Sequence, residues 1–252
     1  MEEVNRPPVE REKRPRRRRS DYGAVFTTQR DLELFQFVGE QYAVTLPQLA
    51  RLIDRSTHTA RSLRDRWKRA GWINSGRLAV DLPSFVWLTG RGAVGSPFRV
   101  WQPHHGLAVH IAAVTDVRLL IEHDLGLGRW ECERAVAQAI ARERGGHRRH
   151  LPDGVLRTHN EQIAIEVELT LKSRDRLEKL VEDLCVDYTR TWYFAKPPIA
   201  ETLREQISET GYRNIDVYSH PPRAEEFSFA PTRIDEEEPW DGSAEPGWES
   251  PW

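Results

Sequence analysis

The sequence predicts an α+β protein with two folded units between charged ends. Three segments with helical spacing of apolar residues follow one another soon after Ala24, and a hairpin pattern comes after them. From about residue 150 the pattern changes to two strands and then to helix, strand, helix and strand, which is typical of an α/β domain with a mixed sheet. We therefore expect a helical unit over 23–100 and an α/β domain over 101–220.

Length and composition exclude several classes of protein. The chain has 252 residues, of which 38% are hydrophobic and 30% are charged, so we expect a folded centre with solvated ends. No apolar run approaches the roughly 20 residues that span a bilayer, and the first residues are charged where a secretion signal would be apolar. Two cysteines, Cys132 and Cys185, are too few for a disulfide scaffold or a four-thiolate zinc site. We expect a cytoplasmic protein without a membrane segment.

The two ends of the chain carry opposite charge. Residues 1–19 hold eight Lys or Arg and four Glu, whereas residues 221–252 hold nine Asp or Glu and two Arg. Both ends have few apolar residues to bury, so we expect 1–22 and 221–252 to be disordered. Such an asymmetry indicates a protein that handles polyanions, and the alternative is that both tails only aid solubility.

Capping residues divide the first unit into three helices. Thr28 with Asp31 is a capping pair that begins the first helix. Thr45 begins the second, with a proline in the first turn, where no backbone N–H is needed. Ser56 begins a third helix, and Gly71 ends it because glycine readily adopts the left-handed backbone of a helix C-terminus.

A hairpin pattern follows the third helix. The apolar stretches Trp72-Ile73 and Phe85–Leu88 flank a turn signal at Asn74-Ser75-Gly76, and Thr89–Gly92 is the expected start of a new helix. Three helices and a hairpin in so few residues predict an N-terminal winged helix-turn-helix. In DNA-binding proteins of this plan the recognition helix, here the third, enters the major groove.

The exposed face of the third helix supplies the predicted DNA contacts. Ala60, Leu63, Trp67 and Ala70 recur on its buried side, which leaves basic residues exposed. Residues of the first turns approach base edges, and the later charges and the hairpin meet phosphates. The alternative is that any charged helix exposes such a face. The predicted DNA-binding residues are Ser56, Thr57, His58, Arg61, Ser62, Arg64, Lys68 and Arg77.

Alternating patterns define the second unit. Leu107 and Ile111 are among the residues expected inside its first helix. Residues 130–141 fit either a strand or a helix, and over 130–145 we favour a strand followed by a loop. The other expected elements are a helix over 104–124, strands over 150–157 and 162–169, a helix over 173–187, a strand over 191–195, a helix over 199–210 and a strand over 214–218.

Three carboxylates are the sharpest chemical signal in the sequence. Asp153 follows Pro152 at the start of one strand, and Glu166 and Glu168 share a face of the next because strand side chains alternate. If the strands pair as a hairpin, the three carboxylates form a metal site for Mg²⁺ or Mn²⁺, which can activate water and stabilise the charge of a phosphodiester. Lys172 follows closely enough to position that water. The alternative is that both glutamates face solvent on a half-buried strand.

This pattern resembles the PD-(D/E)xK nuclease superfamily, in which an Asp on one strand is followed by Glu-x-Lys on the next. Pro152-Asp153 matches the first half and Glu166 the acidic position, whereas Glu168 stands where most members have lysine. The resemblance implies a restriction-endonuclease-like α/β domain and, if the chain is a nuclease, catalytic roles for Asp153, Glu166, Glu168 and Lys172.

Residues 24–218 together resemble the replication-relaxation family of actinobacterial plasmids and other mobile elements. The matching stretches are Leu151–Leu156, Ala164–Ser173 and a helix that contains His105–Val109 and Asp116–Arg118. The resemblance implies a DNA-associated role in replication initiation, relaxation or mobilisation, and it does not supply a reaction.

The remaining candidates concern partners. Four histidines between residues 104 and 123 lack the spacing and the cysteine partners of a zinc site, so we expect structural or surface roles for them. Trp240, Trp248 and Trp252 in the acidic end indicate a docking segment for a replication or transfer protein, or a segment that competes with DNA for the basic surface. A homodimer is compatible with either role.

We therefore predict a DNA-binding protein of a plasmid or other mobile element. The first alternative is a metal-dependent DNA endonuclease that the winged helix directs to its site. The second is an adaptor whose tails recruit a replication or transfer protein.

Overall fold

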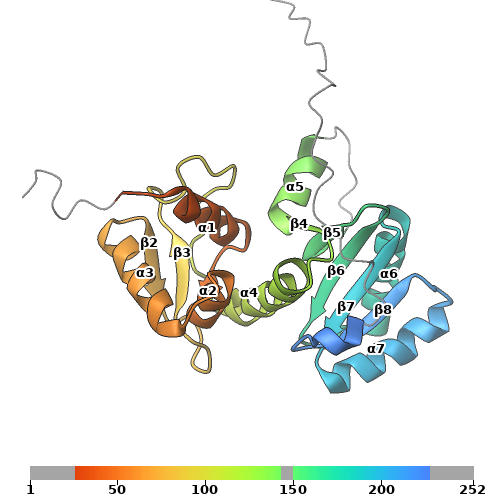
Figure 1. Cartoon of the computed structure of the whole chain (residues 1–252). Helices are drawn as coiled ribbons and strands as arrows, with labels where there is room; N and C mark the ends of the chain where they lie inside the picture. The colour runs from red at the N-terminus through yellow and green to blue at the C-terminus, as the bar shows by residue number, and fades with distance from the viewer. Residues whose placement is uncertain (1–25, 143–149, 228–252) are drawn as a thin grey trace, which may run out of the picture.

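The computed structural model describes residues 26–142 and 150–227, which form seven α-helices and two β-sheets (Figure 1). The mixed α+β class is therefore confirmed. The predicted tail 1–22 and most of the predicted tail 221–252 lie outside the described residues. None of the described helices is both long and apolar enough to cross a bilayer.

Three helices and a small sheet form the N-terminal unit, and the predicted caps are confirmed. The side chain of Thr28 accepts a hydrogen bond from the backbone of Asp31, and the side chains of Thr45 and Ser56 each cap the helix that follows them. The elements are α1 (Gln29–Glu40), β1 (Val44–Thr45), α2 (Leu46–Leu52), α3 (Thr57–Arg69), β2 (Ile73–Gly76) and β3 (Phe85–Leu88).

The small sheet is antiparallel, with strand order β1-β3-β2. Asn74-Ser75-Gly76 pairs with β3, so the turn predicted there is wrong, and residues 77–84 connect the two strands. The helix predicted to begin at Thr89–Gly92 is also wrong, since this stretch forms a turn. Glycines interrupt it, and glycine disfavours helix propagation.

The C-terminal unit begins with a long helix and continues with a five-stranded sheet. Its elements are α4 (His105–Arg118), the π-helical turn η1 (Leu119–Asp124), β4 (Arg129–Cys132), α5 (Glu133–Arg142), β5 (Gly154–Arg157), β6 (Gln162–Glu168), α6 (Arg174–Asp187), β7 (Arg190–Ala195), α7 (Pro197–Thr210), β8 (Ile215–Ser219) and the 3₁₀ turn η2 (Ala224–Phe227).

Two expectations for this unit are corrected. Residues 133–142 form a helix, not the predicted loop, because Glu133 and the alanines that follow are strong helix formers. The predicted disorder from residue 221 is wrong for the first residues of that segment. Phe227 is buried against Trp192 and Tyr218, so its apolar surface holds the chain to the sheet.

The large sheet has the order β4-β5-β6-β7-β8, with antiparallel pairing up to β6 and parallel pairing after it. The predicted mixed sheet is therefore confirmed. Figure 1 shows α4 on one face of this sheet and α6 and α7 on the other. Ile165 and Phe194 belong to the core under α4, whereas Ala164 and Tyr193 belong to the core under α6 and α7.

Helix α4 packs against both units. Ala108 and Ala112 join a core with Phe85 of the small sheet, while Val117 joins the core of the large sheet. Leu107 is exposed, so its predicted buried position is wrong. A helix covered on two sides does not show the single apolar stripe from which buried positions are predicted.

Polar contacts reinforce this junction. The side-chain amide of Gln48 donates to the carbonyl of Ala112 at 2.7 Å and to Asp116 at 2.8 Å. The guanidinium of Arg118 pairs with Glu40 at 2.7 Å. The N-terminal unit therefore rests on a long helix of the C-terminal unit through both apolar and hydrogen-bonded contacts.

Candidate functional site

A buried aspartate anchors α3 to α1. One carboxylate oxygen of Asp31 accepts a hydrogen bond from the indole N–H of Trp67 at 2.7 Å and pairs with Arg66, and the other accepts from the backbone N–H of Thr28 at 2.9 Å. Burial alone would raise the pKa of Asp31, but these hydrogen bonds and the Arg66 charge lower it on balance. The buried side of α3 is thus fixed, and its opposite side faces solvent.

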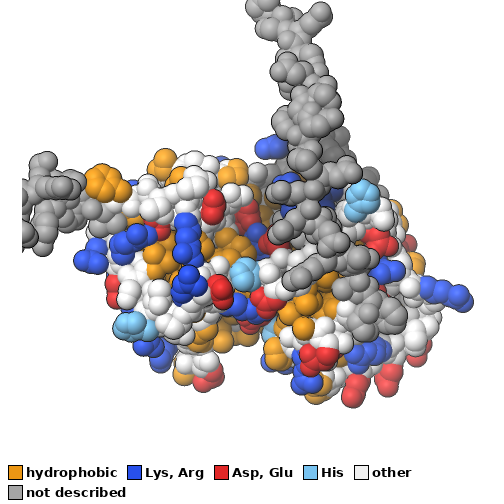
Figure 2. All heavy atoms as spheres, viewed as in Figure 1, with side chains coloured by type: hydrophobic (Ala, Val, Ile, Leu, Met, Phe, Trp, Pro, Cys, Tyr) orange, Lys and Arg blue, Asp and Glu red, His pale blue; other side chains and the backbone are white. Residues whose placement is uncertain are grey.

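The exposed side of α3 carries a basic stripe. Thr57, Arg61, Arg64 and Lys68 follow one another at helical spacing, so they lie on one face. Arg61 and Lys68 are exposed and make no ion pair with any residue that the structure describes. Arg64 is half-buried and pairs with Asp65 at 2.8 Å. Figure 2 shows Lys and Arg side chains along the outer edge of the N-terminal unit.

The other predicted DNA-binding residues are exposed around this stripe. The hydroxyl of Ser56 caps α3, and that of Ser62 donates to the carbonyl of His58 at 3.3 Å. Arg77 directly follows β2 and is also exposed. These side chains, together with Thr57, occupy the start of α3 and the adjoining edge of the hairpin.

The carboxylates gather at one end of β5 and β6. Gly154 lies opposite Ile165, so Asp153 comes beside Glu166 on the neighbouring strand. One carboxylate oxygen of Asp153 accepts from the backbone N–H of Val167 at 2.8 Å. Glu166 and Glu168 are each only 4% exposed, so the alternative that they face solvent is wrong.

Two histidines complete the site, and sequence reasoning missed both. Nε2 of His110 on α4 lies 2.8 Å from Asp153, and Nε2 of His150 lies 2.8 Å from Glu166. His150 stands three residues before Asp153, a proximity that could have marked it as a candidate. His110 is 43 residues away in the chain, and no local pattern links it to the carboxylates.

Lys172 neutralises the remaining carboxylate. It forms an ion pair with Glu168, four residues earlier, and its charge also interacts with Asp153 and Glu166. Burial lowers the pKa of Lys172, and the carboxylate charges oppose that shift. The structure thus brings together the four predicted residues Asp153, Glu166, Glu168 and Lys172.

The electrostatics are those of crowded like charges balanced by cations. Burial and the charge of Asp153 raise the pKa of Glu166. The same two causes raise the pKa of Glu133 on α5. Burial favours the neutral form of His110, but its hydrogen bond to Asp153 and the carboxylate charges raise its pKa on balance. The cluster therefore favours the charged form of His110 more than water does.

As placed, these side chains do not offer a free set of metal ligands. Both oxygens of Asp153 face protein hydrogen-bonding groups, Glu166 faces His150, and Glu168 pairs with Lys172. Within 26–142 and 150–227 no three His, Cys, Asp or Glu residues are arranged to hold a metal ion. The predicted Mg²⁺ or Mn²⁺ site stays a prediction, and the geometry is that of a self-neutralised polar cluster.

A small cavity adjoins this cluster. A cavity of about 30 Å³ lies between Tyr42, His110, Glu133 and Asp153, where the hydroxyl of Tyr42 donates to Glu133 at 3.1 Å. A volume of this order holds about one water molecule. This cavity is too small for a nucleotide.

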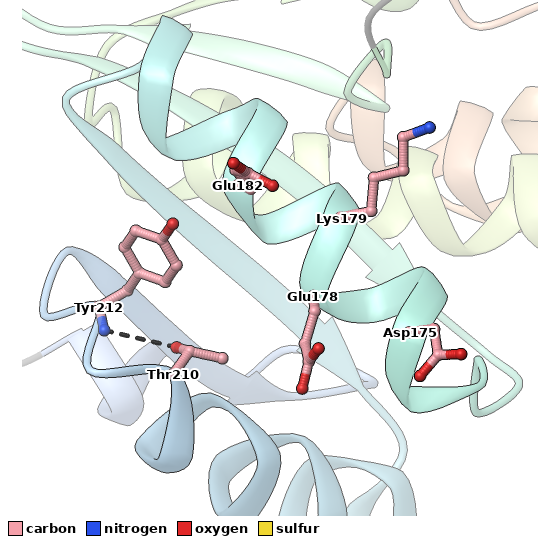
Figure 3. A pocket seen from close by; sticks show the side chains of 6 residues that line it. All are labelled: Asp175, Glu178, Lys179, Glu182, Thr210 and Tyr212. Carbon is pink, nitrogen blue, oxygen red and sulfur yellow. Dashed lines mark hydrogen bonds between the residues drawn. The ribbon is translucent and has the colours of Figure 1, made fainter.

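A wider hollow of about 610 Å³ lies between α6 and the end of α7 (Figure 3). In Figure 3, Glu178 and Tyr212 approach it from opposite sides, whereas Lys179 points away. Carboxylates dominate its lining, so the hollow disfavours polyanions and does not extend the basic stripe. The lining residues are Asp175, Glu178, Lys179, Glu182, Thr210 and Tyr212.

Comparisons of the chain with protein-family models, with curated proteins and with solved structures find no match.

Proposed function

We propose that the protein binds double-stranded DNA and that α3 is its recognition helix. The observation that carries the proposal is the basic stripe, in which Arg61 and Lys68 are exposed and unpaired within the described chain while Asp31 anchors the opposite side of the helix. Helix α2 precedes α3 closely and the β2–β3 hairpin follows it, as in a winged helix-turn-helix.

The residues divide by position into two kinds of contact. Thr57, Arg61 and Ser62 lie in the first turns of α3, which reach base edges when a recognition helix enters the major groove. Lys68 near the end of α3 and Arg77 beside the hairpin suit phosphates, which fix the protein on the duplex without reading sequence. Sequence preference would then depend on Arg61 more than on Lys68.

In this proposal the C-terminal unit is a PD-(D/E)xK nuclease-like domain that acts as a scaffold. Its support is the mixed sheet and the placement of Asp153 beside Glu166. The full chain would serve replication, relaxation or mobilisation of a plasmid or other mobile element, as its resemblance to the replication-relaxation family implies. The alternative role as an adaptor would depend on the two tails, and most residues of these tails lie outside the described part of the chain.

One observation favours the endonuclease as a second candidate. Two buried glutamates beside an aspartate and a lysine are costly to hold without a function, because burial of like charges opposes folding. The carboxylates are already engaged by protein cations and donors, however, which favours a scaffold.

Incubation of the full chain with supercoiled and linear DNA tests both functions. Parallel reactions contain Mg²⁺, Mn²⁺ or EDTA, and an electrophoretic shift is read beside strand breakage. We expect binding in all three conditions without cleavage. Cleavage that requires metal and is lost in Asp153→Asn would establish the endonuclease, and absence of any shift at low salt would refute DNA binding.

A further inference from the structure

We propose that the acidic C-terminal segment 228–252 docks on the basic stripe of α3 and occupies it until duplex DNA displaces it. The docking is a property of the chain itself, and only the displacement rests on the proposed function. The segment would thereby act as an internal competitor for the DNA-binding surface.

The stripe contains two cations that have no counter-ion in the described chain. Arg61 and Lys68 are exposed and unpaired there, and exposed Arg69 lies beside them. The other cations of α3 are engaged, since Arg64 pairs with Asp65 and Arg66 pairs with Asp31. The positive potential of these side chains attracts an anionic segment of the same chain. The covalent link also keeps that segment at a high local concentration.

The segment matches the stripe in charge and in spacing. It contains seven Asp or Glu and one Arg, and four of its carboxylates are consecutive, at Asp235–Glu238. Arg61 and Lys68 are seven residues apart on α3, which corresponds to about 10.5 Å along a helix axis. Four consecutive residues in extended form also cover about 10 Å. Trp240 follows after Pro239 and offers an aromatic face to an arginine.

The described chain ends on the C-terminal unit, and the acidic segment continues from there. Phe227 is buried beneath α4 beside Trp192, which anchors the start of the segment. Asp235 comes eight residues later, within about 27 Å of extended chain, and the whole segment spans at most about 85 Å. The segment is therefore long enough to extend beyond the C-terminal unit.

Zero-length crosslinking of the full chain tests the docking without DNA. A carbodiimide joins lysine amines to carboxylates in contact, and the chain has five lysines, of which Lys68 is the one on α3. We expect mass spectrometry to find Lys68 joined to the tryptic peptide 234–252. Exposed Lys179 and Lys196 serve as reference amines. In a mixture of ¹⁵N-labelled and unlabelled chains, the crosslinked peptides should have one isotope only.

Three crosslinking results would overturn the proposal. Crosslinks to Lys13 in place of Lys68 would assign the acidic segment to the Arg-rich N-terminal end. Crosslinks to Lys179 and Lys196 as frequent as those to Lys68 would show unspecific contact. Crosslinks of mixed isotope would assign the docking to a second copy of the chain.

Neutralisation of the acidic run tests the competition. The variant carries Asp235→Asn, Glu236→Gln, Glu237→Gln and Glu238→Gln. The control neutralises four exposed carboxylates of α6 and α7, at Asp175, Glu182, Glu201 and Glu205, and changes net charge equally. We expect the first variant to bind duplex DNA roughly three- to ten-fold more tightly than the control at low salt, and equally at high salt.

Equal affinity of the two variants at low salt would refute the competition. If no form of the protein binds duplex DNA, the proposed function fails, whereas the crosslink to Lys68 still decides the docking. If DNA binds and the crosslink to Lys68 does not form, the docking alone is refuted.

Discussion

Asp31 should control the stability of the N-terminal unit more than any exposed charge does. Replacement by Ala removes the acceptor of the buried indole N–H of Trp67, which costs about 1–3 kcal/mol for an unsatisfied buried donor. It also removes one half of the capping box with Thr28, worth about 1 kcal/mol. The ion pair with half-exposed Arg66 adds at most about 1 kcal/mol.

We therefore expect Asp31→Ala to lower the free energy of unfolding by about 3–4 kcal/mol, within the range of large single-residue effects. Urea unfolding followed by tryptophan fluorescence measures it as a lower midpoint with an unchanged slope. Glu33→Ala, an exposed change on the same helix, is the control and should stay within about 0.5 kcal/mol. A loss below about 1 kcal/mol in Asp31→Ala would refute the anchoring role.

The same carboxylate predicts a pH dependence. The folded-state pKa of Asp31 is lowered, so its ionised form stabilises the fold above the unfolded aspartate pKa of about 3.9. That contribution is lost as the pH falls through the folded-state pKa. The stability difference between the parent and Asp31→Asn should therefore be largest above about pH 4 and shrink in more acidic solution. A difference that is constant down to pH 2 would contradict ionisation as its source.

The remaining predictions concern the junction, the sheet and the carboxylates. Gln48→Ala should destabilise the chain by about 2–4 kcal/mol in urea unfolding, because Asp116 and a backbone carbonyl lose their buried donor. Gly154→Ala should cost at least about 2 kcal/mol, since an added Cβ would lie 2.1 Å from the Trp130 ring, whereas Gly90→Ala meets open space and should fold normally. Mg²⁺ and Mn²⁺ should leave the melting temperature unchanged, and a rise of several degrees would show that the carboxylates rearrange around metal.

Local chemistry explains which parts of the fold were predictable. The helix starts followed from capping side chains such as Thr28, Thr45 and Ser56, whose hydrogen bonds are made within three residues. Gly76 misled the prediction, because it reads as a turn residue. In the structure it lies in β2 and pairs with Phe85, and an added Cβ would make only an ordinary contact with the Trp87 ring, at 3.4 Å.

Some contacts of the candidate site could be predicted from the sequence and others could not. Strand alternation and the short β5–β6 connection were enough to place Asp153 beside Glu166. The contact of His110 with Asp153 depends on how α4 crosses the sheet, and no spacing within the sequence encodes that crossing. The sequence around α5 fits a helix as well as a strand, and the interpretation that we favoured, a strand followed by a loop, was wrong from Glu133 onward. Its helix-forming composition was the usable signal.

The most direct test of DNA binding compares two double variants of equal charge. Arg61→Ala with Lys68→Ala removes one Arg and one Lys from α3, and Arg176→Ala with Lys179→Ala removes the same pair from the exposed side of α6. Fluorescence anisotropy with a labelled duplex gives affinity across a salt series. We predict that the α3 variant binds more weakly and that its plot of log affinity against log salt is shallower by up to about 2. The α6 variant should match the parent, and an α3 variant that also matches it would contradict the assignment of α3 as the recognition helix.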